Sequence, residues 1–298
     1  MKVVITGASG FVGRNLSKYL KEKGNEIEAL SLRSDQWTFS EDANALIHLA
    51  GKAHDTRNIS ASEEYFKINT ELTQKVFDKF LDSNIRDFIY FSSVKATADT
   101  VENILDENNI NSPQTPYGKS KLAAEKYILS KNIPAEKRVL IVRPCMIHGP
   151  GNKGNLNLLY KILQKGIPWP LAVFENKRSF LSIDNLNFLI YEMLKNKNVS
   201  AGVYNFSDDQ SLSTNDLIKI IANASGKKAS LLYIPKNIIL GIAKLGDFFR
   251  LPLNSERVKK LTESYVVTNE KIKHAIGIKN LPVSARDGIT NTISSFKK

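Results

Sequence analysis

Two side chains that together can move a proton stand four positions apart in the segment PYGKSK. Tyr117 and Lys121 would share one face if this segment is helical. A tyrosine has an ordinary pKa of about 10, so its hydroxyl is a poor acid or base at neutral pH. A neighbouring ammonium group stabilises the phenolate and lowers that pKa. The pair therefore predicts acid–base catalysis, although the same spacing also occurs on ordinary helices.

Three glycines near the start of the chain suit a phosphate-rich ligand. Gly7, Gly10 and Gly13 lie between the β-branched run Lys2 to Ile5 and a segment with apolar residues at helical spacing. On such a turn the first glycine permits the tight bend, the second admits a pyrophosphate and the third allows close helix packing. The helix N-terminus adds free N–H groups and a partial positive charge. This pattern predicts a dinucleotide site, and the alternative is an ordinary βα connection.

Further strands and helices must position these residues. Runs rich in β-branched residues predict buried strands, and apolar residues at helical intervals predict helices. The expected strands are Glu26 to Leu32, Ala43 to Gly51, Asp87 to Ser93, 138–143 and Ala201 to Phe206, and the expected helices include Ser60 to Asp82 and Ser213 to Ala224. Tyr117 and Lys121 thus open a helix that follows a strand and a polar loop.

The motifs together resemble the short-chain dehydrogenase/reductase superfamily. GxxGxxG in the form TGASGFVG is similar to its extended branch, which acts on nucleotide sugars. A strand-end serine followed by Tyr-x-x-x-Lys is the superfamily's catalytic set, matched here by Ser93, Tyr117 and Lys121. The resemblance implies an α/β fold, a doubly wound parallel (Rossmann) sheet with a smaller C-terminal substrate lobe. It assigns residues 1–150, with a return segment at about 182–206, to the NAD(P)-binding domain, and 151–181 and 207–298 to the lobe.

The resemblance also gives the catalytic candidates their roles. Tyr117 exchanges the proton, and Lys121 lowers its pKa and holds the nicotinamide ribose. Ser93 hydrogen-bonds the substrate carbonyl oxygen and orients it for hydride transfer. Ser92 is the neighbour with which Ser93 could be confused. Asn69 is implied to brace the active-site backbone, and the alternative is a solvated helix residue.

The expected cofactor is NADP, with NAD as the alternative. NAD sites usually carry an acidic residue at the end of the second strand, where this chain reads SLRS. Arg33 could pair with the 2′-phosphate of NADP, which a carboxylate would repel; the alternatives are a plain surface arginine and a late acidic residue, Asp35. The segment Ser34 to Asp42 is also shorter than the strand and helix usual in relatives. The implied cofactor contacts are Gly7, Ser9, Gly10, Phe11, Val12, Gly13, Arg33, Leu49, Ala50, Gly51, Tyr117, Lys121 and Pro144.

The resemblance places substrate contacts after the cofactor domain. Asn155 stands where relatives hydrogen-bond the nucleotide diphosphate, Arg178 where an arginine pairs with it, and Arg257 where a second arginine is common. The match is partial, because the Asp and His of the family's strand are Ser179 and Ser182 here. The implied substrate-binding residues are Ser93, Asn155, Arg178 and Arg257.

Three other reactive side chains are not assigned to catalysis. His48 lies within an apolar run, which predicts a core histidine with satisfied hydrogen bonds. Cys145 has no base motif beside it and is expected to pack rather than to act as a nucleophile. His148 is a weaker candidate for substrate contact.

Several reactions of the family compete for this site. Dehydratases place Asp-Glu directly after the strand-end residue, whereas Val94 and Lys95 follow Ser93, which argues against dehydration. Epimerases retain NAD and usually keep the acidic residue that is missing at Ser31, and reductases use NADPH, which suits Arg33. The sequence thus favours NADP(H)-dependent reduction of a UDP- or TDP-linked 4-keto sugar in bacterial polysaccharide biosynthesis. The alternatives are an NAD-dependent UDP-sugar 4-epimerase and a non-enzymatic NADP-sensing binding protein.

Composition and charge limit the partners and the cellular compartment that we expect for this protein. The net charge is +12, but the lysines are spread along the chain without a recognition motif, so no nucleic-acid partner is expected. The single cysteine excludes an internal disulfide and fits a reducing cytoplasm. The sequence has no metal-ligand spacing and no apolar run of transmembrane length, so no stable membrane insertion is expected. The apolar stretch Ile238 to Leu251 is expected as a buried amphipathic helix, with a membrane-surface helix as the alternative, and a homodimer stays open.

Overall fold

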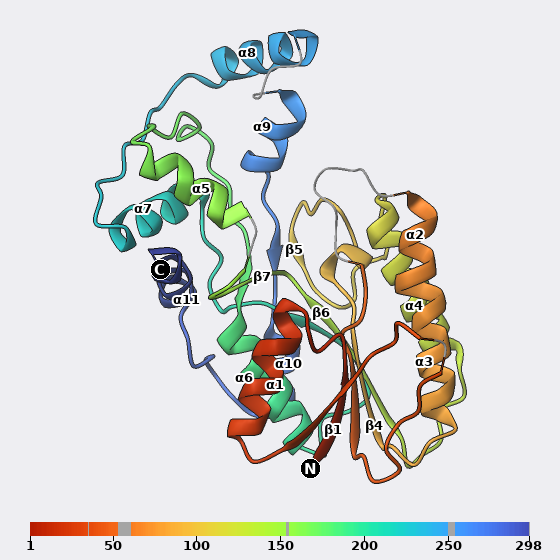
Figure 1. The fold of residues 1–298 in the computed structure, drawn as a ribbon. Coiled ribbons are helices and arrows are strands. Elements are labelled where there is room, and N and C mark those ends of the chain that lie inside the picture. Colours follow the sequence, from red (N-terminus) through yellow and green to blue (C-terminus); the bar gives the residue numbers. More distant parts are fainter. Residues whose placement is uncertain (35, 53–60, 153–154, 250–253, 298) are drawn as a thin grey trace.

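A parallel sheet of six strands forms the centre of the computed structural model (Figure 1). The structure describes residues 1–34, 36–52, 61–152, 155–249 and 254–297, and of Asn155 and Lys297 only the backbone. The strand order is β2-β1-β3-β4-β6-β9, and every neighbouring pair is parallel, which confirms the predicted doubly wound sheet. The strands are β1 (Lys2–Thr6), β2 (Glu26–Leu30), β3 (Ala45–His48), β4 (Asp87–Phe91), β6 (Arg138–Pro144) and β9 (Gly202–Phe206).

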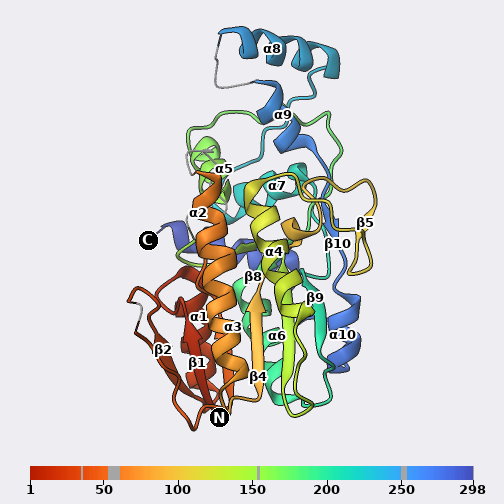
Figure 2. The same ribbon diagram turned by 90° about the vertical axis from the view of Figure 1, so that its right-hand side faces the viewer.

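Helices cover both faces of this sheet (Figures 1 and 2). Alternate strand residues point to opposite faces, so Val3 and Ile5 pack with one set of helices and Val4 packs with Phe77 of the other. Burial on both faces explains why the strands read as continuous apolar runs. One face carries α1 (Phe11–Glu22), α6 (Ile183–Lys195) and α10 (Glu270–Ile276), and the other carries α2 (Ser62–Phe66), α3 (Leu72–Leu81) and α4 (Pro116–Ser130).

The edge strand β2 marks the end at which this sheet is shortened. It ends at Leu30 rather than at the predicted Leu32, and it pairs with β1 alone. The described residues between β2 and β3 form no helix or strand, so the predicted short connection is confirmed. Trp37 and Phe39 of this connection pack against the core beside α3. The connection therefore closes the edge of the core without adding a strand.

The helix predicted over Ser60 to Asp82 is continuous from Ser62 to Leu81 in the structure but is not regular. A π-helical turn, Lys67–Glu71, separates α2 from α3. Such a turn inserts an extra residue and rotates the inward face of the helix. Asn69 and Thr70 of this turn are buried. The apolar spacing that predicted the helix gave no sign of this irregularity.

A second group of helices forms the smaller lobe, with a hydrophobic core of its own. Leu159, Ile218 and Ile289 come from three of these helices and are buried in that core. The predicted cap of α7 is present, because the Ser213 and Asp216 side chains form a capping box. The lobe contains α5 (Asn155–Gln164), α7 (Thr214–Ala224), α8 (Lys236–Phe249), α9 (Ser255–Thr262) and α11 (Ala285–Ser294). Two short parallel pairs stand outside the large sheet: β7 (Met146–His148) with β8 (Phe180–Ser182), and β5 (Ile104–Leu105) with β10 (Val266–Val267).

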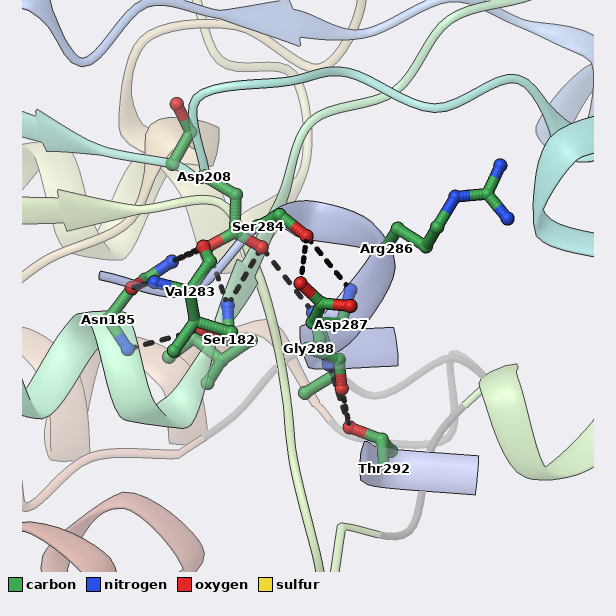
Figure 3. A network of polar contacts seen from close by, with 12 residues as sticks. Ser182, Asn185, Asp208, Val283, Ser284, Arg286, Asp287, Gly288 and Thr292 are labelled. Atoms are coloured by element: carbon green, nitrogen blue, oxygen red, sulfur yellow. Dashed lines mark hydrogen bonds and ion pairs between the residues drawn. The ribbon is translucent and has the colours of Figure 1, made fainter. Parts of the chain in front are cut away.

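A buried polar network fixes α11 against the large domain (Figure 3). The Asp208 carboxylate accepts hydrogen bonds from the Ser182 backbone N–H at 3.0 Å and from the Asn185 side chain at 2.7 Å. The same Asn185 side chain exchanges hydrogen bonds with the Val283 backbone, just before α11, at 2.8 and 3.1 Å. Because these contacts are directional and the Asp208 carboxylate at their centre is buried, the network sets the position of α11 relative to α6.

The helix α8 contradicts the expectation of a buried amphipathic helix. Ile239, Ala243 and Gly246 are buried, but the large apolar side chains on the other faces of the helix are exposed. No helix among the described residues is long and apolar enough to cross a membrane.

Candidate active site

Ser93 and Tyr117 meet at the carboxyl end of the sheet. Ser93 follows β4 and is 7% exposed, and Tyr117 lies in the first turn of α4, where Thr115 caps the helix. Their side-chain hydroxyls form a hydrogen bond. A Cβ atom on Gly118 would lie 2.3 Å from the Lys95 carbonyl oxygen, so only glycine lets the start of α4 approach the loop after β4. The predicted pair is therefore assembled by local backbone geometry as well as by side-chain type.

The structure also separates Ser93 from its neighbour. The Ser92 hydroxyl is buried and donates a hydrogen bond to the carboxylate of Glu125, which lies on α4 about two turns after Tyr117. Ser93 is therefore the serine that contacts Tyr117.

Lys121 lies behind this pair with its ammonium group buried. The side chain is 6% exposed, and its Nζ atom donates to the Phe91 carbonyl oxygen at 2.8 Å. Burial disfavours the charged form and lowers the pKa of Lys121 from 10.5 to about 8, while Glu125 opposes this. A Cβ atom on Gly51 would lie 3.3 Å from Nζ, so the ammonium faces the chain that follows β3.

The pKa of Tyr117 differs from the sequence-based expectation. Burial raises it above the ordinary value, and the hydrogen bond from Ser93 acts in the opposite direction. The expected lowering by Lys121 is thus not present in the protein alone. A positively charged ligand group beside the hydroxyl would favour the phenolate and shift the pKa downwards.

Asn69 braces the backbone of the site, as predicted. It is fully buried in the π turn, and its Oδ1 atom accepts from the Lys52 backbone N–H at 2.7 Å. Its Nδ2 atom donates to the Lys52 carbonyl oxygen and to the Ser120 hydroxyl, both at 3.1 Å. The Ser120 hydroxyl in turn donates to the Tyr117 carbonyl oxygen at 2.8 Å. One amide therefore connects the chain after β3 with the helix that carries Tyr117 and Lys121.

The glycine turn has the geometry expected for a dinucleotide site. Gly7 has φ of +68°, and a Cβ atom there would lie 2.7 Å from the Ala50 backbone nitrogen. A Cβ atom on Gly13 would lie 2.4 Å from the Gly7 carbonyl oxygen. Gly10 is the N-cap of α1 and supplies no capping side chain, and the first turn holds no acidic residue. The N–H groups at this helix start can therefore receive phosphate oxygens, so the turn fits a nicotinamide dinucleotide.

Most of the other predicted cofactor residues lie along the same edge of the sheet. Phe11 and Val12 form the first turn of α1, beside Ser9. Leu49 and Ala50 follow β3 and lie against Gly7. Pro144 ends β6 and pairs with β9. These placements agree with the general rule that parallel sheets bind ligands beyond the carboxyl ends of their strands.

A hollow of about 620 Å³ lies between α1 and β2 and extends from the glycine turn to the last turn of α1. Its lining includes Arg14, Lys18, Lys21 and Glu22; Arg14 donates to the Ser9 carbonyl oxygen at 2.7 Å, and Lys18 pairs with Glu22 at 3.9 Å. Arg33 follows β2 and is exposed, but it does not line this hollow. Asp35 lies outside the described residues. The three basic residues were not predicted, although their spacing of four and three residues places them on one face of α1.

A group of charged residues with three basic members, Lys95, Arg178 and Lys260, lies beyond the loop that follows Ser93. The Arg178 guanidinium donates to the Glu263 carbonyl oxygen at 2.9 Å and to that of Lys260, at the end of α9. Lys95 Nζ lies 4.3 Å from the centre of the Tyr265 ring. Burial lowers the pKa of Lys95; the carboxylates of Asp99 and Glu263 act against this, and the positive charges of Arg178 and Lys260 act with it. Sequence reasoning missed Lys95, although its position directly after the Ser93 segment was a usable signal.

The other residues predicted to contact substrate lie at the start of α5, on α9 and in the buried strand β7. Asn155 begins α5, and its side chain lies outside the described structure. Arg257 is exposed on α9, the helix whose end receives the Arg178 guanidinium. His148 is 1% exposed and hydrogen-bonds Thr292 of α11 at 2.9 Å, so the expectation of a substrate contact is wrong.

The two core predictions hold. His48 contacts the hydroxyls of Thr6 and Thr73 at 2.7 and 3.0 Å, and burial lowers its pKa to about 3, so it is neutral. Cys145 is buried, and burial raises the pKa of its thiol well above the ordinary value. An uncharged buried thiol is a poor nucleophile.

A buried ion pair between Glu125 and Arg143 lies next to Lys121, and the sequence analysis did not predict it. Glu125, one turn after Lys121 on α4, receives two hydrogen bonds from the Arg143 guanidinium at 2.9 and 2.5 Å. Arg143 also donates to Thr97 at 2.9 Å. The carboxylate of this bidentate pair keeps negative charge near the Lys121 ammonium. A buried ammonium is therefore tolerated beside the reacting groups.

Comparison with known proteins assigns the chain to a family. A UDP-glucose 4-epimerase of Vibrio cholerae is 30% identical over 99% of this chain and 95% of its own length. A GDP-6-deoxy-D-mannose reductase of Pseudomonas aeruginosa is 26% identical over 78% of this chain and 83% of its own length. The solved structure of RMD from Pseudomonas aeruginosa complexed with NADPH superimposes with a TM-score of 0.73 at 21% identity, covering 99% of this chain and 98% of that one. The model of the NAD dependent epimerase/dehydratase family matches residues 3–206, and the chain belongs to that family of nicotinamide-dependent nucleotide-sugar enzymes.

Proposed function

We propose that this enzyme reduces a nucleotide-linked 4-keto sugar with NADPH, in the cytoplasm and within polysaccharide biosynthesis. The observation that carries the proposal is a pair of arginines near the predicted position of the cofactor ribose. Arg33 follows β2 where NAD enzymes usually carry a carboxylate, and Arg14, in the first turn of α1, donates to the Ser9 carbonyl oxygen of the glycine turn. These cations favour the 2′-phosphate of NADP over the bare ribose of NAD.

The proposed chemistry uses the residues already assembled at the site. NADPH supplies a hydride to the carbonyl carbon of the sugar. The Tyr117 hydroxyl gives its proton to the carbonyl oxygen, and the Ser93 hydroxyl, within hydrogen-bond reach of Tyr117, orients that oxygen. Lys121 holds the cofactor ribose, and its positive charge favours the phenolate that remains. The product is the corresponding hydroxyl sugar.

We infer that the nucleotide diphosphate binds beside Arg178. This guanidinium is partly buried, and Lys95 and Lys260 add positive charge near it, which the Glu263 carboxylate offsets in part. Two negatively charged phosphates are suited to such a cluster, and fork-shaped guanidinium groups bind them well. The sugar would then extend from the cluster towards Ser93 and Tyr117.

A 4-epimerase is the second candidate, and a specific observation favours it. The Vibrio cholerae relative, which matches nearly the full length of the chain, is described as a UDP-glucose 4-epimerase. An epimerase would use the same serine, tyrosine and lysine, but it would retain NAD and return the hydride to the sugar. The two candidates therefore differ in whether the cofactor is consumed.

Cofactor content and demand distinguish the candidates. A reductase should purify largely without nucleotide and should consume added NADPH with UDP- or TDP-linked 4-keto sugars. An epimerase should retain NAD and interconvert UDP-sugars without any addition. Retention of NAD together with unsupplemented interconversion would overturn the reductase proposal and leave the epimerase in its place.

A binding measurement tests the role of Arg33 separately. The contact with a 2′-phosphate is worth about 1.5–3 kcal/mol, or roughly ten- to hundredfold in affinity. Arg33→Ala should weaken NADPH by that factor and leave NADH nearly unchanged. Arg286→Ala, which removes an exposed arginine of α11, is the matched control.

A further inference from the structure

The helix α8 displays a continuous apolar stripe on the molecular surface. Five large side chains recur at intervals of four, three, three and one residues, which places them on one face of a helix. Leu245 is 58% exposed and Phe248 is 81% exposed. The stripe consists of Ile238, Ile242, Leu245, Phe248 and Phe249. Single exposed apolar residues are ordinary, but a stripe of this kind marks an interaction surface.

The back of α8 explains why the stripe faces outwards. Ile239, Ala243 and Gly246 are buried and recur on a separate face of the helix, about 100° round from the stripe, and Val258 of the neighbouring α9 is buried in the same core. Two of these three residues are small, so the helix lies close to the lobe while its larger side chains project away. The orientation of the stripe is thus set by packing behind it.

The position of α8 leaves this stripe accessible. The helix lies at the extremity of the molecule beyond α9, far from the chain start (Figures 1 and 2). Because β1 begins at the opposite extremity and all strands are parallel, α8 lies on the side towards which their carboxyl ends point. Ser93 and Tyr117 are placed at those same ends. A surface that α8 contacts would therefore lie on the active-site side of the enzyme.

The charge around the stripe indicates which kind of partner binds to it. The segment 227–263 holds eight Lys or Arg residues and three Asp or Glu residues, within a chain of net charge +12. On α8 itself, Lys244 is exposed beside Phe248, whereas Lys236 at the helix start has its Nζ atom 5.7 Å from the centre of the Phe174 ring. A second copy of the chain would bring this positive charge against its like, whereas anionic lipid headgroups would neutralise it. Apolar side chains on one face with lysines beside them are the pattern of an interfacial helix.

We propose that α8 docks this enzyme onto an anionic membrane surface. The helix lies in the plane of the interface, its stripe enters the boundary between headgroups and acyl chains, and Lys244 with the basic residues of the neighbouring segment contacts the headgroups. This role is independent of whether the enzyme is a reductase or an epimerase. It makes no use of a membrane-spanning segment.

Vesicle flotation tests the proposal with the full chain. Wild-type protein should float with vesicles of phosphatidylcholine and phosphatidylglycerol and much less with phosphatidylcholine alone. The double variant Leu245→Glu/Phe248→Glu should lose about tenfold or more in vesicle affinity, because two exposed apolar contacts become charged. Leu129→Glu is the matched control, since Leu129 is also 58% exposed but lies on α4 of the large domain. Both substitutions are at exposed positions, and circular dichroism with cofactor binding verifies that the proteins are folded.

A fluorescence measurement reports on α8 itself. Phe248→Trp should shift its emission to shorter wavelength when the anionic vesicles are added. Wild-type protein that stays in solution, or a double variant that floats as well as wild type, overturns the proposal. A wild-type dimer that the double variant converts to monomers, without vesicle binding by either, would show that a second copy covers the stripe and would also overturn it.

Discussion

Replacing Lys121 by methionine should stabilise the protein while removing its activity. Burial lowers the Lys121 pKa from 10.5 to about 8, so the folded protein holds this proton less tightly than the unfolded chain. The difference corresponds to about 3 kcal/mol below pH 8. Methionine keeps the length and apolar character of the side chain, but it loses the 2.8 Å hydrogen bond to the Phe91 carbonyl oxygen, which offsets about 1–2 kcal/mol. We expect a net gain of about 1–2 kcal/mol in the free energy of unfolding at pH 7.

The stability difference between the two proteins should depend on pH in a defined direction. Between pH 8 and pH 10.5 the unfolded chain binds the Lys121 proton and the folded protein does not. Wild-type stability therefore rises with pH in this window through Lys121, and the variant lacks that contribution. The difference in free energy of unfolding between Lys121→Met and wild type should therefore decrease steadily from about pH 8 upwards.

Urea unfolding of both proteins across this pH range provides the measurement. Other lysines titrate in both proteins alike, so the difference between the two curves isolates Lys121. Lys119→Met, at an exposed position on the same helix, should leave stability nearly unchanged. A Lys121→Met protein that is less stable than wild type at pH 7, or that follows the same pH dependence, would refute the reasoning from burial.

Three further predictions concern the site and the junction of the lobe. Tyr117→Phe removes the transferable proton, so turnover should fall by roughly 10²–10⁴ in steady-state assays while calorimetric cofactor affinity survives; near-normal turnover would remove Tyr117 from the mechanism. Arg178→Ala should weaken UDP binding by about 1.5–3 kcal/mol with little effect on NADP, and unchanged UDP affinity in calorimetry would place the diphosphate elsewhere. Gly288→Ala should lower the free energy of unfolding by about 1–3 kcal/mol, because its Cβ would lie 2.9 Å from Ser182 Cβ and 3.2 Å from His148 Cε1. Thermal unfolding that matches wild type would show that this junction can relax.

The sequence determined the parts of this protein that depend on short-range pattern. Gly7, Gly10 and Gly13 stand at a strand-to-helix turn because the residue types on either side favour those elements locally. Tyr117 and Lys121 share a face because one helix carries both. The parallel sheet and the family followed from the same motifs. Such features need only a few neighbouring residues, so composition and spacing suffice to predict them.

Tertiary structure decided every feature in which distant segments meet. Ser93 rather than Ser92 contacts Tyr117, because the two serines meet different turns of α4: the Ser92 hydroxyl donates to Glu125, and the Ser93 hydroxyl hydrogen-bonds Tyr117. Arg143 reaches Glu125 only across the junction of β6 and α4, and no local pattern predicts that pairing.

Tertiary structure also decided which of these side chains are buried and which are exposed. An apolar helix sequence predicts burial only if another element covers it, and α8 projects beyond the lobe with its stripe uncovered. His148 was equally ambiguous in sequence, and the packing of α11 against β7 buried it. Burial is a property of the neighbours that a side chain acquires on folding, and those neighbours come from distant parts of the chain.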